Sequence, residues 1–200
     1  MMRIIRKLSR PKPTSHSFAW VLLGIISTGF ALSMLLTQDT KWANWHLSRL
    51  GEGNSTASFI FNGTMVLAAM VLILLATRIA DEMSHRHNSR GARRLQAALV
   101  MVAICLVGVG AFPFDKFPVI HNIFGYGQFF VLSGLILTLR AIYPHFRERT
   151  YIIGYVAVGI TMLLMVLFHL THFTTLLIVE LIGQLLAYAW VLSITRDMAE

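Results

Sequence analysis

The chain has 200 residues, of which 56% are apolar and only 13% are charged. Soluble domains carry about 25% charged residues, so this composition excludes an ordinary soluble enzyme and a disordered chain. The mean hydropathy of +0.67 and the grouping of apolar residues into long runs indicate an integral membrane protein.

Six apolar runs are long enough to cross a hydrocarbon core, which is about 30 Å thick and needs about 20 helical residues. The runs are continuously apolar and do not alternate every second residue, which argues against strands. The sequence therefore predicts an all-α integral membrane protein, a bundle of six transmembrane helices over residues 18–36, 58–80, 95–112, 119–142, 151–168 and 173–195.

Lys and Arg are distributed unevenly over the links between these runs. Only Lys41, Arg49 and Lys116 lie in the first, third and fifth links, whereas the other fourteen of the 17 precede the first run, flank the second and fourth links or follow the last run. The positive-inside rule then places both termini in the cytoplasm. The chain is expected to comprise a basic N-terminal arm (1–17), the six-helix transmembrane domain (18–195) and a short cytoplasmic tail (196–200).

The positions of these basic residues also bear on partners. A net charge of +8 in a soluble protein suggests nucleic acid, but basic residues at membrane edges contact anionic headgroups instead. We therefore expect membrane lipids and no nucleic acid as partners, with protein partners unknown. The expected location is a cell membrane, with the bacterial inner membrane as the first choice.

Polar residues inside a bilayer are costly, and here they gather near one membrane face. The fourth run carries His121 and Gln128 seven positions apart, and the sixth carries Glu180 and Gln184 four apart, spacings that put each pair on one helical face. Five separate segments contribute polar groups at one depth, which favours a cavity open to the outside. Its expected lining is Ser48, Asn62, Asp115, His121, Gln128, Glu180 and Gln184.

Each of these residues also has a purely structural interpretation. A Glu or Gln in a span often only bonds a neighbouring helix, at about 0.6 kcal/mol on average. Glu180 lies about 10 Å below the outer edge, where an ionised carboxylate costs several kcal/mol. We expect it to be protonated or paired with a donor such as His121 or Arg49.

Histidines and carboxylates in the outer links raise the question of a metal. Zinc takes about four ligands from His, Cys, Asp and Glu, and Asp115, His121, His169 and His172 are the candidates. No His-Glu-x-x-His pattern is present, and ordinary interfacial histidines explain the same residues. A hydrolytic set of Ser48, His121 and Asp115 can also be drawn, but no nucleophile elbow surrounds Ser48. Cofactor content and enzymatic activity both stay open.

Two stretches of the chain resemble a known family. They are Ser48-Arg49-Leu50-Gly51-Glu52-Gly53, followed by Phe61-Asn62, and Gly108-Val109-Gly110-Ala111-Phe112-Pro113-Phe114-Asp115, with His121 six residues later. They resemble the bacterial and archaeal multi-pass membrane family known as domain of unknown function 998, over about residues 15–195. The resemblance implies a six-helix membrane protein and no established reaction, and Ser48, Gly51, Asn62, Pro113, Asp115 and His121 match the family's recurring positions.

A more distant similarity is to the superfamily of alkaline ceramidases and adiponectin receptors, which are membrane hydrolases that hold zinc. Those proteins carry His-x-x-x-His in the last helix, whereas His169 and His172 here are three apart and Ser48 lies in a link.

The predicted topology and the polar residues lead to three candidate functions. The first is a non-enzymatic protein whose outward-facing polar cavity binds a lipid headgroup or small solute. The alternative is a metal-dependent lipid hydrolase at the outer leaflet. Ion- or proton-coupled transport through Glu180 ranks last, because almost no polar path continues below Tyr188.

Overall fold

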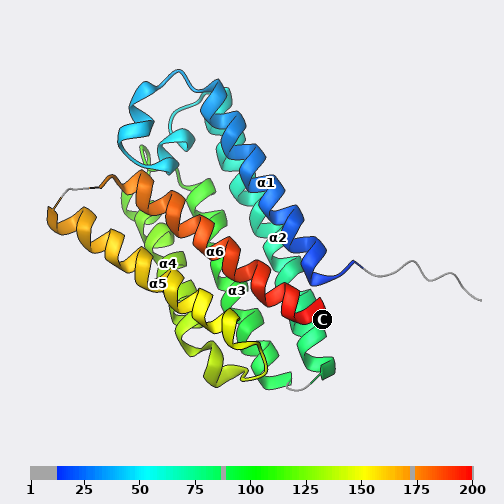
Figure 1. Cartoon of the computed structure of the whole chain (residues 1–200). Helices are drawn as coiled ribbons and strands as arrows, with labels where there is room; N and C mark the ends of the chain where they lie inside the picture. The colour runs from blue at the N-terminus through cyan, green and yellow to red at the C-terminus, as the bar shows by residue number, and fades with distance from the viewer. Residues whose placement is uncertain (1–12, 87–88, 172–173, 200) are drawn as a thin grey trace, which may run out of the picture.

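The computed structural model describes residues 13–86, 89–171 and 174–199. Each of its six α-helices is long and apolar enough to cross a membrane, which confirms the predicted all-α, multi-pass membrane fold. The α-helices are α1 (Ser15–Leu36), α2 (Thr56–Arg86), α3 (Ser89–Ala111), α4 (Pro118–Ile142), α5 (Glu148–Thr171) and α6 (Leu176–Ala199), and two short 3-10 helices, η1 (Thr40–Asn44) and η2 (Leu47–Gly51), lie between α1 and α2 (Figure 1).

The helix ends differ from the apolar runs by up to six residues, because caps rather than hydropathy determine them. Ser55 accepts a hydrogen bond from the Ser58 amide at 3.1 Å, so α2 begins at Thr56. Thr175 accepts from the Ile178 amide in the same way at 3.4 Å, so α6 begins at Leu176. At the other end α2 continues to Arg86, since a charged sequence remains helical outside the lipid.

The ends of α1 and α6 differ from the predicted boundaries of the N-terminal arm and the C-terminal tail. Most of the predicted N-terminal arm, residues 1–12, lies outside the described residues, and α1 begins at Ser15 within the rest of the arm. The predicted tail is helical as far as Ala199, because α6 runs on past residue 195.

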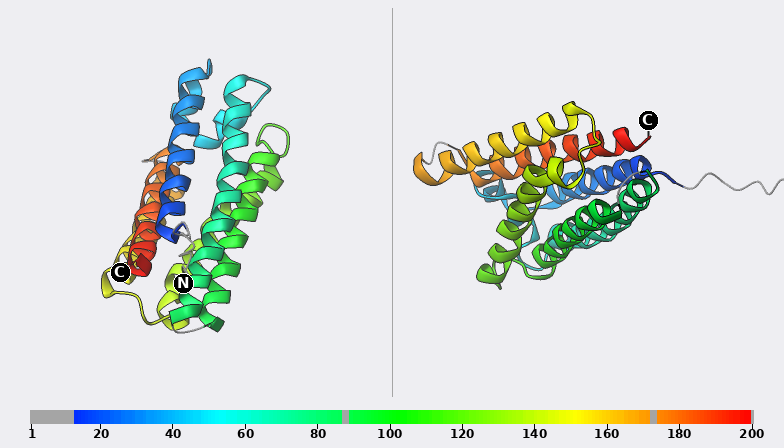
Figure 2. Two further views of the ribbon diagram at one scale, coloured as in Figure 1. Left: turned by 90° about the vertical axis from the view of Figure 1, so that its right-hand side faces the viewer. Right: turned by 90° about the horizontal axis from the view of Figure 1, so that it is seen from below.

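The six helices form a closed ring in which each helix contacts its neighbours in sequence and α6 returns to α1. Seen from below, α5 and α6 lie along one side and α2 and α3 along the opposite side (Figure 2, right). The contact between α4 and α5 is the least extensive in the ring. The interior of the ring is therefore bounded by all six helices.

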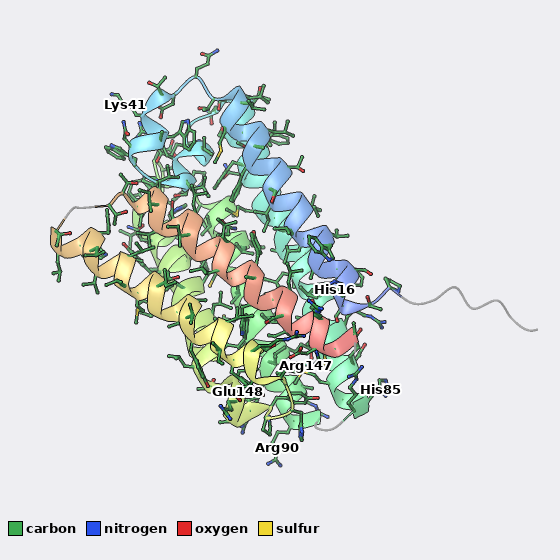
Figure 3. All side chains as sticks on the ribbon, in the orientation of Figure 1. His16, Lys41, His85, Arg90, Arg147 and Glu148 are labelled. Carbon is green, nitrogen blue, oxygen red and sulfur yellow. The ribbon has the colours of Figure 1, made fainter. Side chains whose placement is uncertain are left out.

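Most of the arginines of the described helices lie near one end of this bundle. His16, His85, Arg90 and Arg147 lie at one end, which we call the basic end, and Lys41 lies at the opposite end (Figure 3). We call the latter the loop end, because the link between α1 and α2 covers it.

Polar contacts fasten the helices together at the basic end. The Asp197 carboxylate of α6 accepts hydrogen bonds from the Thr150 hydroxyl at 2.7 Å and the Arg147 amide at 3.0 Å. The Glu82 carboxylate of α2 accepts from the amide and hydroxyl of Ser15, at 3.0 and 2.6 Å, and so caps α1. These contacts fix the beginnings of α1 and α5 and the end of α6 at the basic end.

Two glycines allow especially close helix packing. A Cβ added to Gly29 of α1 would overlap the side chain of Thr64 on α2. A Cβ added to Gly154 of α5 would lie 2.8 Å from both Ile136 on α4 and Trp190 on α6. Small residues at such crossings let helix backbones approach where lipid provides no hydrophobic driving force.

Candidate functional site

The link between α1 and α2 folds back over the loop end of the ring. This link, residues 37–55, is called the loop segment below. The amide of Leu177 donates to the Trp45 carbonyl at 3.0 Å, and the amide of Leu47 donates to Glu180 Oε2 at 2.5 Å. Both hydrogen bonds join the loop segment to the first two turns of α6. The loop segment is therefore a fixed part of the bundle.

An ion pair stiffens the outer half of the loop segment. Arg49 Nε donates to Asp39 Oδ2 at 2.5 Å, and the Arg49 guanidinium lies 4.6 Å from the centre of the Trp45 ring. The hydrogen bond from Arg49 lowers the pKa of the Asp39 carboxyl. Arg49 is thus occupied by Asp39 and is not the partner of Glu180.

A cavity of about 420 Å³ lies inside the ring below the loop segment. Every helix contributes to its wall, which runs along α4 from His121 to Ile136 and along α6 from Leu176 to Val191. Each of these stretches spans about 22 Å at 1.5 Å per residue. The volume lies in the range of about 300–1,000 Å³ that is typical of ligand sites, and most of the wall is apolar.

Five of the predicted site residues line this cavity, namely Ser48, His121, Gln128, Glu180 and Gln184. On α6, Glu180, Gln184 and Tyr188 follow one another at intervals of four residues, and Gln184 Nε2 donates to the Tyr188 hydroxyl at 2.8 Å. His121 Nδ1 lies 2.9 Å from the Phe112 carbonyl. Because a carbonyl can only accept, Nδ1 carries the proton and Nε2 is left as an acceptor.

The other two predicted residues, Asn62 and Asp115, are not among the lining residues of the cavity. Asn62 Nδ2 donates to the Gly51 carbonyl at 2.9 Å, and Asp115 Oδ2 accepts from the Gly53 amide at 3.1 Å. Asn62 therefore joins Gly51 of the loop segment to α2. Asp115 joins Gly53 of the same segment to the link after α3. Asn62 also lines a separate groove at the loop end, together with Lys116.

Glu180 has a donor, as one of its two expected states requires, but that donor is neither His121 nor Arg49. The donor is the backbone amide of Leu47, whereas His121 donates to Phe112 and Arg49 to Asp39. A backbone donor has no residue-type signature, so composition gives no indication of it. The sequence therefore identified the acceptor but not the donor.

Within the loop segment, His46 lies between Ser48 and Glu52. Its Nδ1 lies 2.9 Å from the Ser48 hydroxyl oxygen, and its Nε2 lies 3.7 Å from Glu52 Oε1. The His46 side chain is only 10% exposed. Burial lowers the pKa of His46 to about 4 and raises the pKa of the Glu52 carboxyl. Both shifts disfavour a charged pair, so His46 is neutral at neutral pH.

The ring of Phe114 lies between the two cavity histidines. Its centroid is 5.2 Å from that of His46 and 5.8 Å from that of His121, with edge-to-face geometry in both pairs. This aromatic contact keeps the two imidazoles apart and packs the link after α3 against the loop segment.

The proposed metal ligands are not brought together within the described part of the chain. Asp115 is exposed, His121 lies in the cavity wall, and His169 is exposed near the end of α5. Among residues 13–86, 89–171 and 174–199, no three His, Cys, Asp or Glu side chains are grouped as metal ligands. His172 lies outside the described residues, so a metal set that includes it stays a prediction.

Sequence reasoning missed Asn122 and Tyr126 as cavity residues. They are one and five positions after His121, and the same helical face that selects Gly125 and Gln128 also includes them. Their position beside His121 on the inward face of α4 was the signal that could have identified them.

Comparison with curated proteins and with solved structures finds no match for this chain. A family model described as protein of unknown function (DUF998) matches residues 21–197. This range begins within α1 and ends within α6, and it includes the whole cavity and the loop segment. The chain is a multi-pass membrane protein that belongs to the DUF998 family.

Proposed function

We propose that this protein binds a membrane amphiphile in its central cavity, with the polar group at the loop end and the acyl chain along the apolar wall. The supporting observation is that one cavity combines both environments. His46, Ser48 and Glu180 line its loop end, and Leu72, Leu99 and other apolar side chains line the rest. Apolar pockets with a few convergent polar groups are typical of ligand sites.

The chemistry of the lining favours an uncharged headgroup. The lining includes the carboxyl group of Glu180, hydroxyl groups and side-chain amides, but among the described residues it contains no Lys or Arg. A phosphate would require such cations, whereas hydroxyl and ester oxygens bind well to amides and hydroxyls. A neutral acylglycerol has the headgroup that this lining fits best.

The direction of entry follows from the distribution of charge. The basic end carries Arg78, Arg86 and Arg90, and the positive-inside rule assigns such an end to the cytoplasm. The loop end then faces outward, and the amphiphile comes from the outer leaflet.

Two glycines on α4 provide a matched test of the cavity. A Cβ added at Gly125 meets nothing within 4 Å, and Gly125 lines the cavity. A Cβ added at Gly134 also meets nothing, but Gly134 is exposed on the outside of the bundle. Gly125→Leu should therefore place its side chain in the cavity, and Gly134→Leu should leave the cavity open.

Binding is measured with a fluorescent monoacylglycerol and the protein in phosphatidylcholine nanodiscs. We expect Gly125→Leu to weaken binding at least about tenfold, because filling the pocket removes about 1.4 kcal/mol or more of binding free energy. Gly134→Leu should bind as the wild type does. Equal binding by both variants, or no saturable binding by the wild type, would refute the proposal.

A further inference from the structure

The loop segment places three reactive groups in a row at the end of the cavity. Ser48 lines the cavity, and its hydroxyl oxygen lies 2.9 Å from His46 Nδ1. On the other side of the imidazole, Nε2 lies 3.7 Å from Glu52 Oε1. A hydroxyl, an imidazole and a carboxyl group in this order make up the arrangement that activates serine nucleophiles.

Two atoms in this row lack the hydrogen bonds expected of buried groups. His46 Nε2 and Glu52 Oε1 are both buried, and neither has a hydrogen-bond partner among the described residues. Buried polar atoms are nearly always bonded, so an unpaired couple indicates a functional constraint. The 3.7 Å separation is one that a small side-chain movement would close, and catalytic hydrogen bonds are often long before substrate binds.

We infer that Ser48, His46 and Glu52 form a hydrolytic centre that cleaves acyl esters held in the cavity, with Ser48 as nucleophile, His46 as general base and Glu52 as a positioning residue. The inference rests on the proposed function, because the cavity has to hold the acyl chain of the substrate. A neutral glycerol ester with a single acyl chain is the substrate class that the lining fits.

The first half of the reaction forms an acyl-enzyme. The Ser48 hydroxyl oxygen attacks the ester carbonyl carbon while its proton passes to His46 Nδ1. The bond between the carbonyl carbon and the alcohol oxygen breaks, and the alcohol leaves with the proton from His46. The side-chain amides of Asn122 and Gln128 supply N–H donors to the same cavity.

The second half regenerates the enzyme. A water molecule attacks the acyl carbon and gives one proton to His46, which passes it to the departing Ser48 oxygen. The products are a fatty acid and an alcohol, and one water is consumed per ester. His46 can serve in both halves because burial keeps the imidazole neutral at neutral pH, with a lone pair available on Nδ1.

Two serines allow a matched test. Ser193 on α6 is also buried, but it is not among the lining residues of the cavity, and its hydroxyl donates to the Trp190 carbonyl at 2.8 Å. The full-length protein in nanodiscs is treated with an alkyl fluorophosphonate, and labelled peptides are located by mass spectrometry. Fatty acid release from a monoacylglycerol is measured for the wild type, Ser48→Ala and Ser193→Ala.

We expect the label on Ser48 and not on Ser193, and at least a 100-fold loss of hydrolysis in Ser48→Ala, since removal of one member of such a set usually costs more than that. Ser193→Ala should hydrolyse normally. Glu52→Gln should lower kcat with little change in KM, because a positioning residue orients the imidazole and does not hold the acyl chain.

The remaining outcomes separate the two proposals. The hydrolytic inference alone would be overturned if the amphiphile binds saturably but Ser48 is not labelled, and if the wild type and Ser48→Ala release fatty acid equally. Absence of binding would overturn the proposed function and the inference together. Hydrolysis that a chelator abolishes and zinc restores would replace the serine mechanism with a metal-dependent one.

Discussion

The backbone amide of Leu47 donates a hydrogen bond to the carboxyl group of Glu180, which lies 133 positions later in the chain. This bond and the one between Leu177 and Trp45 fix the loop segment over the cavity. The same loop segment carries His46, Ser48 and Glu52, so the position of the candidate reactive groups depends on α6.

Removing the Glu180 carboxyl group should release the loop segment. Glu180→Ala leaves the Leu47 amide without its acceptor, and we expect a loss of about 1.5–3 kcal/mol of unfolding free energy. Glu180→Gln retains an acceptor oxygen and should lose less. Unfolding in mixed micelles measures both variants, and equal stabilities for Ala and Gln would show that the hydrogen bond contributes nothing.

Two glycines of α1 should respond in opposite ways to alanine. A Cβ at Gly29 would overlap the Thr64 side chain, so Gly29→Ala should destabilise the protein by about 1–3 kcal/mol through overpacking. A Cβ at Gly24 meets nothing within 4 Å, and Gly24→Ala should be neutral or gain up to about 1 kcal/mol from helix propensity. Thermal unfolding in detergent compares them, and a loss in both variants would contradict the packing argument.

The Asp197 contacts should dominate the polar stabilisation of the basic end. The Asp197 side chain is 3% exposed and bonds to Thr150 and Arg147, so Asp197→Asn should cost about 2–3 kcal/mol. The ion pair of Arg140 and Glu148 has exposed side chains, so Glu148→Gln should change stability by less than about 1 kcal/mol. Similar losses from the two variants in denaturant titrations would argue against this ranking.

Acid should destabilise the protein through His46. The unfolded imidazole has a pKa of about 6.5, whereas burial lowers the folded pKa of His46 to about 4. Between these pH values the unfolded chain binds a proton that the folded protein does not, so stability falls as the pH decreases, by about 3 kcal/mol in total. Arg49 and His121, which lie nearby, act in the same direction on the His46 pKa.

Glu52 has the opposite effect, because burial raises its pKa and the folded protein takes up its proton more readily as the pH falls. The comparison of wild type with His46→Gln isolates the imidazole. Between pH 7 and pH 4.5 the melting temperature of the wild type should fall further than that of His46→Gln. Parallel curves for the two proteins would rule out a depressed His46 pKa.

The six spans and the fold class were predictable because hydropathy is a local property. Each of the stretches from Ser15–Leu36 to Leu176–Ala199 is identified by its own composition, without reference to any other part of the chain. The predicted ends were less accurate, since a cap such as Ser55 or Thr175 depends on one backbone hydrogen bond.

The sequence also indicated that polar groups gather at one end, because helix periodicity places His121, Gln128, Glu180 and Gln184 on inward faces. It could not separate cavity residues from residues that brace the loop segment. Asn62 and Asp115 carry the same amide and carboxyl groups as the cavity residues, yet they bond to the backbone of Gly51 and Gly53.

Only the tertiary structure determined which groups meet. The donor to Glu180 is a backbone amide, and the approach of Glu52 to His46 depends on how η2 turns the chain between them. Side-chain polarity can be read from single positions, whereas a hydrogen bond requires two positions to be placed to within a few tenths of an ångström. That placement comes from the packing of α6 against the loop segment, and no residue type encodes it.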